Sequence, residues 1–159
     1  MTIEQVLSVL RETPDRIGLL TAGTSDARLD EPPEPGEWCA TEILAHLRAC
    51  ADTWGGAIET IIDTDRPTIR AVNPTSWIEE TDYRDLPFSS SLRAFTKQRT
   101  RLLATLEPLP EGAWRRSAVV LGAGAPLELT VHSYGSRMAR HERTHWRQLA
   151  KTLAALSPG

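Results

Sequence analysis

The five residues from His141 to His145, HERTH in one-letter code, lie inside the last segment of helical periodicity, Thr130 to Leu156. Helical residues advance by about 100° each, so two histidines four positions apart share one face of the helix. They stand where the apolar stripe of this segment would otherwise continue with leucines, and we therefore expect both to point into the core. Two buried imidazoles need polar partners, and this is a spacing at which two histidines can bind one metal ion.

The same five residues match the HExxH motif of zinc proteases, in which the glutamate is the general base. One protease class needs a third histidine at HxxGxxH spacing, but residues 146–149 are WRQL. The other class needs a later acidic ligand, and no Asp or Glu follows Glu142. A protease is therefore disfavoured, and a third ligand has to come from upstream. We interpret Glu142 as a residue of a surface ion pair. The alternative is a carboxylate that hydrogen-bonds to one of the metal-binding histidines.

Three further segments have helical periodicity. Residues 2–22 contain Pro14, which indicates either a kinked helix or two consecutive helices. The second segment opens at Trp38, with Cys39 and Glu42 placed as a weakened capping box, and its inner stripe contains His46. The third segment covers residues 89–106. Together with the last segment, these helices predict an all-α fold, a four-helix bundle in one domain of residues 1–159.

The connections between these helices are long. Residues 23–37 hold three prolines and are expected to form a loop without regular structure. Residues 63–88 are polar and broken by prolines, which suggests a segment that crosses the bundle. Residues 107–130 predict either a short β-hairpin or an irregular excursion.

His46, His141 and His145 are the three histidines that the periodicity turns inward. Together they could supply three nitrogen ligands and leave one or more positions of a metal open for water or substrate. His132, nine residues before His141, falls on the opposite face and is interpreted as a surface or helix-start residue. Because each ligating imidazole must be unprotonated, we expect metal to be lost as the pH falls through roughly 6.

Composition excludes several other classes. The net charge of −3 gives no general attraction to nucleic acid, and no apolar run approaches the length of a membrane span. Cys39 and Cys50, the two cysteines, would lie about 16 Å apart along one helix, too far for a disulfide. Reduced thiols and the lack of a signal peptide predict a cytoplasmic protein.

The order and spacing of these motifs resemble the DinB/YfiT-like superfamily of metalloenzymes. The resemblance covers nearly the whole chain and lies in WCxxEILAHL at 38–47, FxxxR at 95–99 and HExxHxxQ at 141–148. One departure is Cys39, where the family usually has serine. The resemblance implies an up-down-down-up four-helix bundle, often dimeric, in which His46, His141 and His145 hold zinc, nickel or iron, with zinc as the first choice.

The resemblance also implies a function. Branches of the family transfer low-molecular-weight thiols such as bacillithiol or mycothiol, and others are described as hydrolases. A metal held by three neutral histidines would activate a thiol or a water molecule at neutral pH, so a small-molecule substrate is expected. Aromatic and polar residues near the open end could frame that substrate, although tryptophans in a helical protein are more often core anchors and we assign none of these residues a catalytic role; they are Trp54, Trp77, Tyr83, Arg137 and Trp146. The alternative is a binding module without turnover, dimerising through a helix face.

Overall fold

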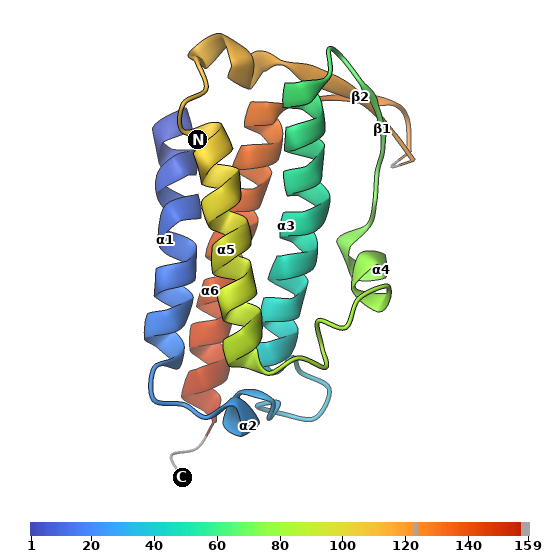
Figure 1. The fold of residues 1–159 in the computed structure, drawn as a ribbon. Coiled ribbons are helices and arrows are strands. Elements are labelled where there is room, and N and C mark those ends of the chain that lie inside the picture. The colour runs from blue at the N-terminus through green and yellow to red at the C-terminus, as the bar shows by residue number, and fades with distance from the viewer. Residues whose placement is uncertain (123, 157–159) are drawn as a thin grey trace.

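Four long helices form the body of the protein in the computed structural model, which describes residues 1–122 and 124–156 (Figure 1). The long helices are α1 (Ile3–Thr21), α3 (Ala40–Asp63), α5 (Phe88–Leu106) and α6 (Val131–Ala155). Shorter elements occupy the connections: α2 (Asp26–Leu29), β1 (Thr68–Arg70), α4 (Pro74–Glu79), the 3-10 helix η1 (Glu111–Arg115), β2 (Ser117–Leu121) and β3 (Leu127–Thr130). The four predicted helical segments are confirmed.

The starts of three long helices follow from side chains that satisfy free backbone N–H groups. Thr2, Cys39 and Thr130 cap α1, α3 and α6, each in a reciprocal capping box. At α3 the Cys39 sulfur accepts from the backbone N–H of Glu42, while the Glu42 carboxylate accepts from the N–H of Cys39 at 2.9 Å. The box predicted with a cysteine cap is therefore present, and it fixes where α3 begins relative to His46.

Helix α1 is continuous across Pro14, so the alternative of two consecutive helices is wrong. Proline lacks an N–H and leaves a carbonyl of the preceding turn without its usual partner. The Thr13 hydroxyl donates to the carbonyl oxygen of Val9 at 2.8 Å, which supplies another hydrogen bond within that turn. Packing of Val6, Leu10 and Ile17 in the core then stabilises both halves as one element.

Each long helix packs against two others. Helix α6 contacts α1 and α3, and α5 contacts the same two helices from the other side. In the view of Figure 1, α1 and α6 run downward, whereas α3 and α5 run upward. Apolar side chains from all four helices fill one core, with Phe88, Phe95 and Trp114 among its largest fully buried residues. Among the described helices, none is both long and apolar enough to cross a membrane.

A three-stranded sheet near one end of the bundle corrects the expectation of a purely helical protein (Figure 1). Strands β2 and β3 form the antiparallel hairpin that the sequence allowed, with Ser117 opposite Thr130. Strand β1 adds in parallel to β2, with Thr68 opposite Val119. Three residues with alternating exposure are too short for a sequence signal, so β1 was missed.

The connections also contain two short helices where loops were expected. Helix α2 lies in the segment 23–37, capped by Ser25, and α4 lies in the segment 63–88. Because α3 and α5 run in the same direction, residues 64–87 return along the side of the bundle (Figure 1). The Asp52 carboxylate of α3 holds this return, accepting from Trp77 Nε1 at 3.2 Å and from the Tyr83 hydroxyl at 2.6 Å.

Candidate metal centre

Three histidine side chains converge between α3 and α6. His141 Nε2 lies 3.1 Å from His46 Nε2 and 3.0 Å from His145 Nε2. A neutral ring nitrogen carries either one proton or one lone pair, so His141 Nε2 cannot form two good hydrogen bonds at once. A shared cation removes this conflict, and ligand nitrogens about 2.1 Å from a tetrahedral metal would lie about 3.4 Å apart. The structure thus brings together the three histidines selected from the sequence, and two of them, His46 and His141, form with Cys50 a cluster of donor atoms that could hold a metal ion.

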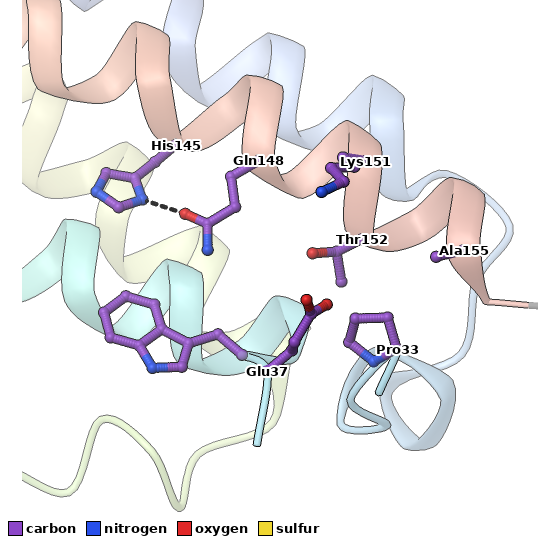
Figure 2. Close-up of a pocket in the computed structure, with 8 residues that line it drawn as sticks. Pro33, Glu37, His145, Gln148, Lys151, Thr152 and Ala155 are labelled. Atoms are coloured by element: carbon purple, nitrogen blue, oxygen red, sulfur yellow. Dashed lines mark hydrogen bonds between the residues drawn. The ribbon is translucent and has the colours of Figure 1, made fainter. Parts of the chain in front are cut away.

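The tautomer of His145 follows from its neighbour on α6. His145 Nδ1 lies 2.8 Å from the side-chain carbonyl oxygen of Gln148, as Figure 2 shows. A carbonyl oxygen only accepts, so Nδ1 carries the proton and Nε2 presents a lone pair toward His141. Such an outer hydrogen bond orients a ligating imidazole and raises its basicity. Gln148 therefore leaves the Nε2 lone pair of His145 directed toward His141.

Burial keeps these imidazoles neutral. Loss of solvent, followed by repulsion from His145, lowers the pKa of His46 to about 4. Burial and the neighbouring histidines lower the pKa of His141 to about 3, and burial also lowers the pKa of His145. Lone pairs are therefore available at neutral pH without the removal of protons.

Cys50 is a fourth potential donor, which the sequence analysis treated only as a reduced thiol. Its Sγ lies 3.6 Å from His46 Nε2 and 4.0 Å from His141 Nε2, and the residue is 3% exposed. Burial and the nearby Glu142 carboxylate raise the pKa of the thiol to about 12. The signal in the sequence was its position four residues after His46, on the same helix face.

Two tryptophans flank the histidines. Trp38, just before α3, lies against His46 with ring centroids 5.3 Å apart and stacks on His145 at 6.4 Å. Trp54 meets the ring of His141 edge-on at 5.0 Å. Trp38 remains 36% exposed, so it borders the centre on the solvent side instead of filling the core.

The other framing candidates are dispersed. Arg137 lies over the ring of Trp54 at 5.7 Å and so belongs to the surroundings of His141. Trp77 and Tyr83 instead hold the return segment against Asp52, and Trp146 packs under the guanidinium of Arg16. Of the five residues considered from the sequence, Trp54 and Arg137 are those whose contacts place them beside the histidines.

A cavity of about 420 Å³ opens beside His145 (Figure 2). Its walls come from α6, with Gln148 and Lys151, and from the segment before α3, with Glu37 and Trp38. The side chains of Glu37 and Lys151 provide one negative and one positive charge. Of the three convergent histidines, His145 is the one that lines this cavity.

Glu142 is buried, which corrects the interpretation of a surface ion pair. Only 2% of the residue is exposed, and its carboxylate pairs with the guanidinium of Arg99 on α5, which is equally buried. Complete burial raises the pKa of the Glu142 carboxyl, and the Arg99 charge opposes that shift. Arg99 on the inner stripe of the third helical segment was the overlooked signal, because a buried arginine needs an anionic partner.

His132 occupies the start of α6, as expected, where its Nε2 lies 2.9 Å from the carbonyl oxygen of Met1. Its ring also lies against Trp114, with centroids 6.4 Å apart. These contacts are with the N-terminus and η1, so they give His132 a packing role separate from the three convergent histidines.

Comparison with known proteins adds independent information. The family model described as the DinB superfamily matches residues 9–149. A protein named "Putative metal-dependent hydrolase" from Geobacillus thermodenitrificans is 25% identical over 135 residues, which cover 81% of this chain and 72% of that protein.

Two solved structures share the fold. YfiT from Bacillus subtilis, described as a probable metal-dependent hydrolase with an unusual four-helix bundle topology, matches with a TM-score of 0.76 and 20% identity. The match covers 96% of this chain and 87% of YfiT. A mycothiol-dependent maleylpyruvate isomerase matches with a TM-score of 0.70 and 13% identity over 94% of this chain and 61% of that one. At these identities the likeness establishes the architecture alone.

Proposed function

The chain belongs to the DinB superfamily, and on that premise we propose that it is a metal-dependent enzyme whose divalent ion is held by His46, His141 and His145. The observation that carries the proposal is the convergence of the three Nε2 atoms, with the tautomer of His145 set by Gln148. The relative named as a metal-dependent hydrolase supports the same class of activity. Zinc is the proposed metal, because imidazole and a nearby thiol suit it, with nickel or iron as alternatives.

The proposed reaction is the transfer of a low-molecular-weight thiol to a small electrophile. A divalent ion at this centre would supply a positive charge that makes a thiol or a water molecule acidic near neutral pH. Three neutral histidines leave that charge uncompensated. Support for a thiol comes from the mycothiol-dependent enzyme with this fold, and the hydrolase relative favours water as the second candidate nucleophile.

The residues around the centre have separable roles in this proposal. Trp38 and Trp54 flank the histidine rings and limit the access of bulk water. Glu37 and Lys151, on the walls of the cavity beside His145, would bind the charged groups of the thiol substrate. Gln148 orients His145 and is a positioning residue.

Several expectations from the resemblance accompany this proposal. The helix directions in Figure 1 support assignment of the up-down-down-up order. A single domain of residues 1–159, a homodimer and a cytoplasmic location also stay predictions. Gel filtration with light scattering tests the dimer, because it measures mass without reference to activity.

Elemental analysis tests the metal centre directly. Protein purified without an affinity tag or chelator is expected to contain about one transition-metal ion per chain. The His46→Ala/His145→Ala variant should contain none while keeping its helical circular dichroism, and His132→Ala is the matched control that should keep the metal. Equal metal content in the wild type and the double variant, or no binding of added zinc or nickel by the wild type, would overturn the assignment.

The catalytic claim needs a separate experiment. Metal-loaded protein is expected to consume mycothiol or bacillithiol in the presence of a small electrophile such as monochlorobimane, and activity should return when zinc is added back to folded apo-protein. A metal-binding protein that accelerates neither thiol transfer nor ester hydrolysis would favour the binding module, for which histidine substitutions lower stability alone.

Cobalt substitution tests whether Cys50 joins the three histidines. A thiolate bound to cobalt gives an intense near-ultraviolet absorption band, whereas a site of histidines and water lacks it. If Cys50 donates to the ion, the band should be present in the wild type and absent in Cys50→Ser, with cobalt still bound. A spectrum without the band would limit the ligands to the histidines.

A further inference from the structure

A second cavity, of about 220 Å³, takes Tyr134 and Arg137 from the first half of α6, whereas the cavity of Figure 2 takes its α6 residues from His145 onward. It is bordered by α3, by the three-stranded sheet and by α6, and both Trp54 and Arg137 line it. The Trp54 ring, which lines the cavity, also meets the ring of His141 edge-on, with centroids 5.0 Å apart. A small molecule in the cavity would therefore contact a side chain that itself contacts His141.

The walls of this cavity are mostly apolar. Ile69, Val120 and Leu129 contribute from the three strands, and Trp54 and Tyr134 contribute from α3 and α6. The volume is below that of a typical drug-sized pocket, which limits the occupant to a compact molecule. An apolar body of about the size of one phenyl ring with a short chain suits these walls.

The charges at the cavity have one sign. Arg70 and Arg137 are its charged lining residues among those described, and no Asp or Glu borders it. Neither arginine has a carboxylate partner within residues 1–122 and 124–156, although the chain as a whole has more acidic than basic residues. A guanidinium next to an apolar wall is a natural receptor for a carboxylate attached to an apolar group.

We propose that this cavity, which we call the sheet cavity, binds the electrophilic substrate, and that this substrate is a small carboxylate with an apolar body. Arg137 would bind the carboxylate, since its guanidinium already lies over Trp54, the residue that links the sheet cavity to His141. The cavity beside His145, with Glu37 and Lys151, would then receive the thiol. The role as electrophile site rests on the proposed function, whereas the binding of the carboxylate does not.

Isothermal titration calorimetry with 3-phenylpropionate and its neutral amide, 3-phenylpropionamide, tests the inference. The acid is expected to bind at least about tenfold more tightly than the amide, because a charge-assisted hydrogen bond is lost in the amide. Arg137→Gln should abolish this preference, and Arg137→Lys should retain part of it. Arg140→Gln is the matched control, an exposed arginine on the same helix that does not line the sheet cavity.

A carboxylate can also bind a metal directly, so the titrations are repeated on zinc-loaded and on chelator-treated protein that circular dichroism shows to be folded. Dependence on Arg137 in both forms supports the sheet cavity. Equal affinities for acid and amide, unchanged binding in Arg137→Gln, or a preference that disappears with the metal would overturn it. If the protein binds metal but does not prefer the acid, the proposed function stands and the sheet-cavity proposal fails. If it prefers the acid but binds no metal, the sheet-cavity proposal stands and the proposed function fails.

Discussion

His141 and Glu142 are adjacent on α6 and point to different neighbours, and they belong to two polar groups of opposite character, one half-buried and one fully buried. Glu142 pairs with Arg99 of α5, so that group contains both an anion and a cation. His141 meets His46 and His145, three neutral side chains whose nitrogens converge without a cation among them. The first group is electrically complete within the protein. The second carries no charge of its own, and the metal proposed above would be its counterpart to the Arg99 cation of the first group.

The largest expected effect of a single substitution at neutral pH concerns the Arg99–Glu142 pair. Arg99→Met should lower the free energy of unfolding by about 3–5 kcal/mol, because it leaves the buried Glu142 carboxylate without a partner. In Arg99→Met/Glu142→Leu the loss should largely be recovered, since two apolar side chains replace both charges. Urea unfolding of the metal-free proteins measures both values. If Arg99→Met were as stable as the wild type, the ion pair between Arg99 and Glu142 would not form in solution.

The pH dependence of stability is expected to come from the histidine group. Its members have pKa values near 6.5 when unfolded, against about 4 for His46 and about 3 for His141 when folded. Between these values the unfolded chain binds more protons, so the stability of metal-free protein falls as the pH decreases from about 6.5 toward 4. The full contribution of these histidines to the free energy of unfolding is present above pH 6.5. Each unit by which a pKa differs between the folded and unfolded states corresponds to about 1.4 kcal/mol.

Urea titrations at several pH values measure this slope, and His46→Ala/His141→Ala is the matched variant in which it should be reduced. An unchanged slope in that variant would assign the effect to other groups. The same shifts modify the expectation that metal leaves near pH 6. Protons compete less with a metal for imidazoles whose pKa is lowered in the folded protein, so metal loss should move to lower pH.

The smallest expected effect concerns Gln148, which orients one member of the histidine group. Gln148→Leu removes the acceptor that holds the Nδ1 proton of His145, and such outer contacts typically change metal affinity by about 10–100-fold. Competition with a chromophoric chelator measures the affinity, with Gln98→Leu, on α5, as a control outside the histidine cluster. Because the change leaves the Arg99–Glu142 pair intact, the stability of apo-protein should change little. Unaltered affinity would remove Gln148 from the role of positioning residue.

The histidines were predictable because helical periodicity is a strong signal over long segments. His46, His141 and His145 each replace an apolar residue in a stripe, and the stripes identify which faces meet. The three histidines meet because the inward face of α3 packs against the inward face of α6. The capping box at Cys39 was equally local, since cap and partner are three residues apart.

The features that were missed depend on contacts between distant segments. Glu142 was assigned to the surface because its side chain is rotated by about 100° from His141 around the helix axis. That rotation directs it toward α5, where it pairs with Arg99 on the inward face of that helix. Strand β1 exists because β2 offers a free edge fifty residues later in the chain, and its own three residues carry no periodicity. Cys50 had the correct spacing from His46, yet a lone thiol in a stripe usually indicates packing.

The parallel pairing of β1 with β2 has a kinetic consequence. Thr68 and Val119 are about fifty residues apart, so closing this loop costs more chain entropy than forming the hydrogen bonds within each helix, and the sheet should form after the helices. Conversely, β1 should be among the first elements to detach in the native ensemble, since it is short and lies at an edge. Because β1 forms one wall of the sheet cavity, its detachment would open that cavity to solvent while the bundle stays folded. Hydrogen exchange is then expected to show faster opening of the β1 amides than of the amides in the four long helices.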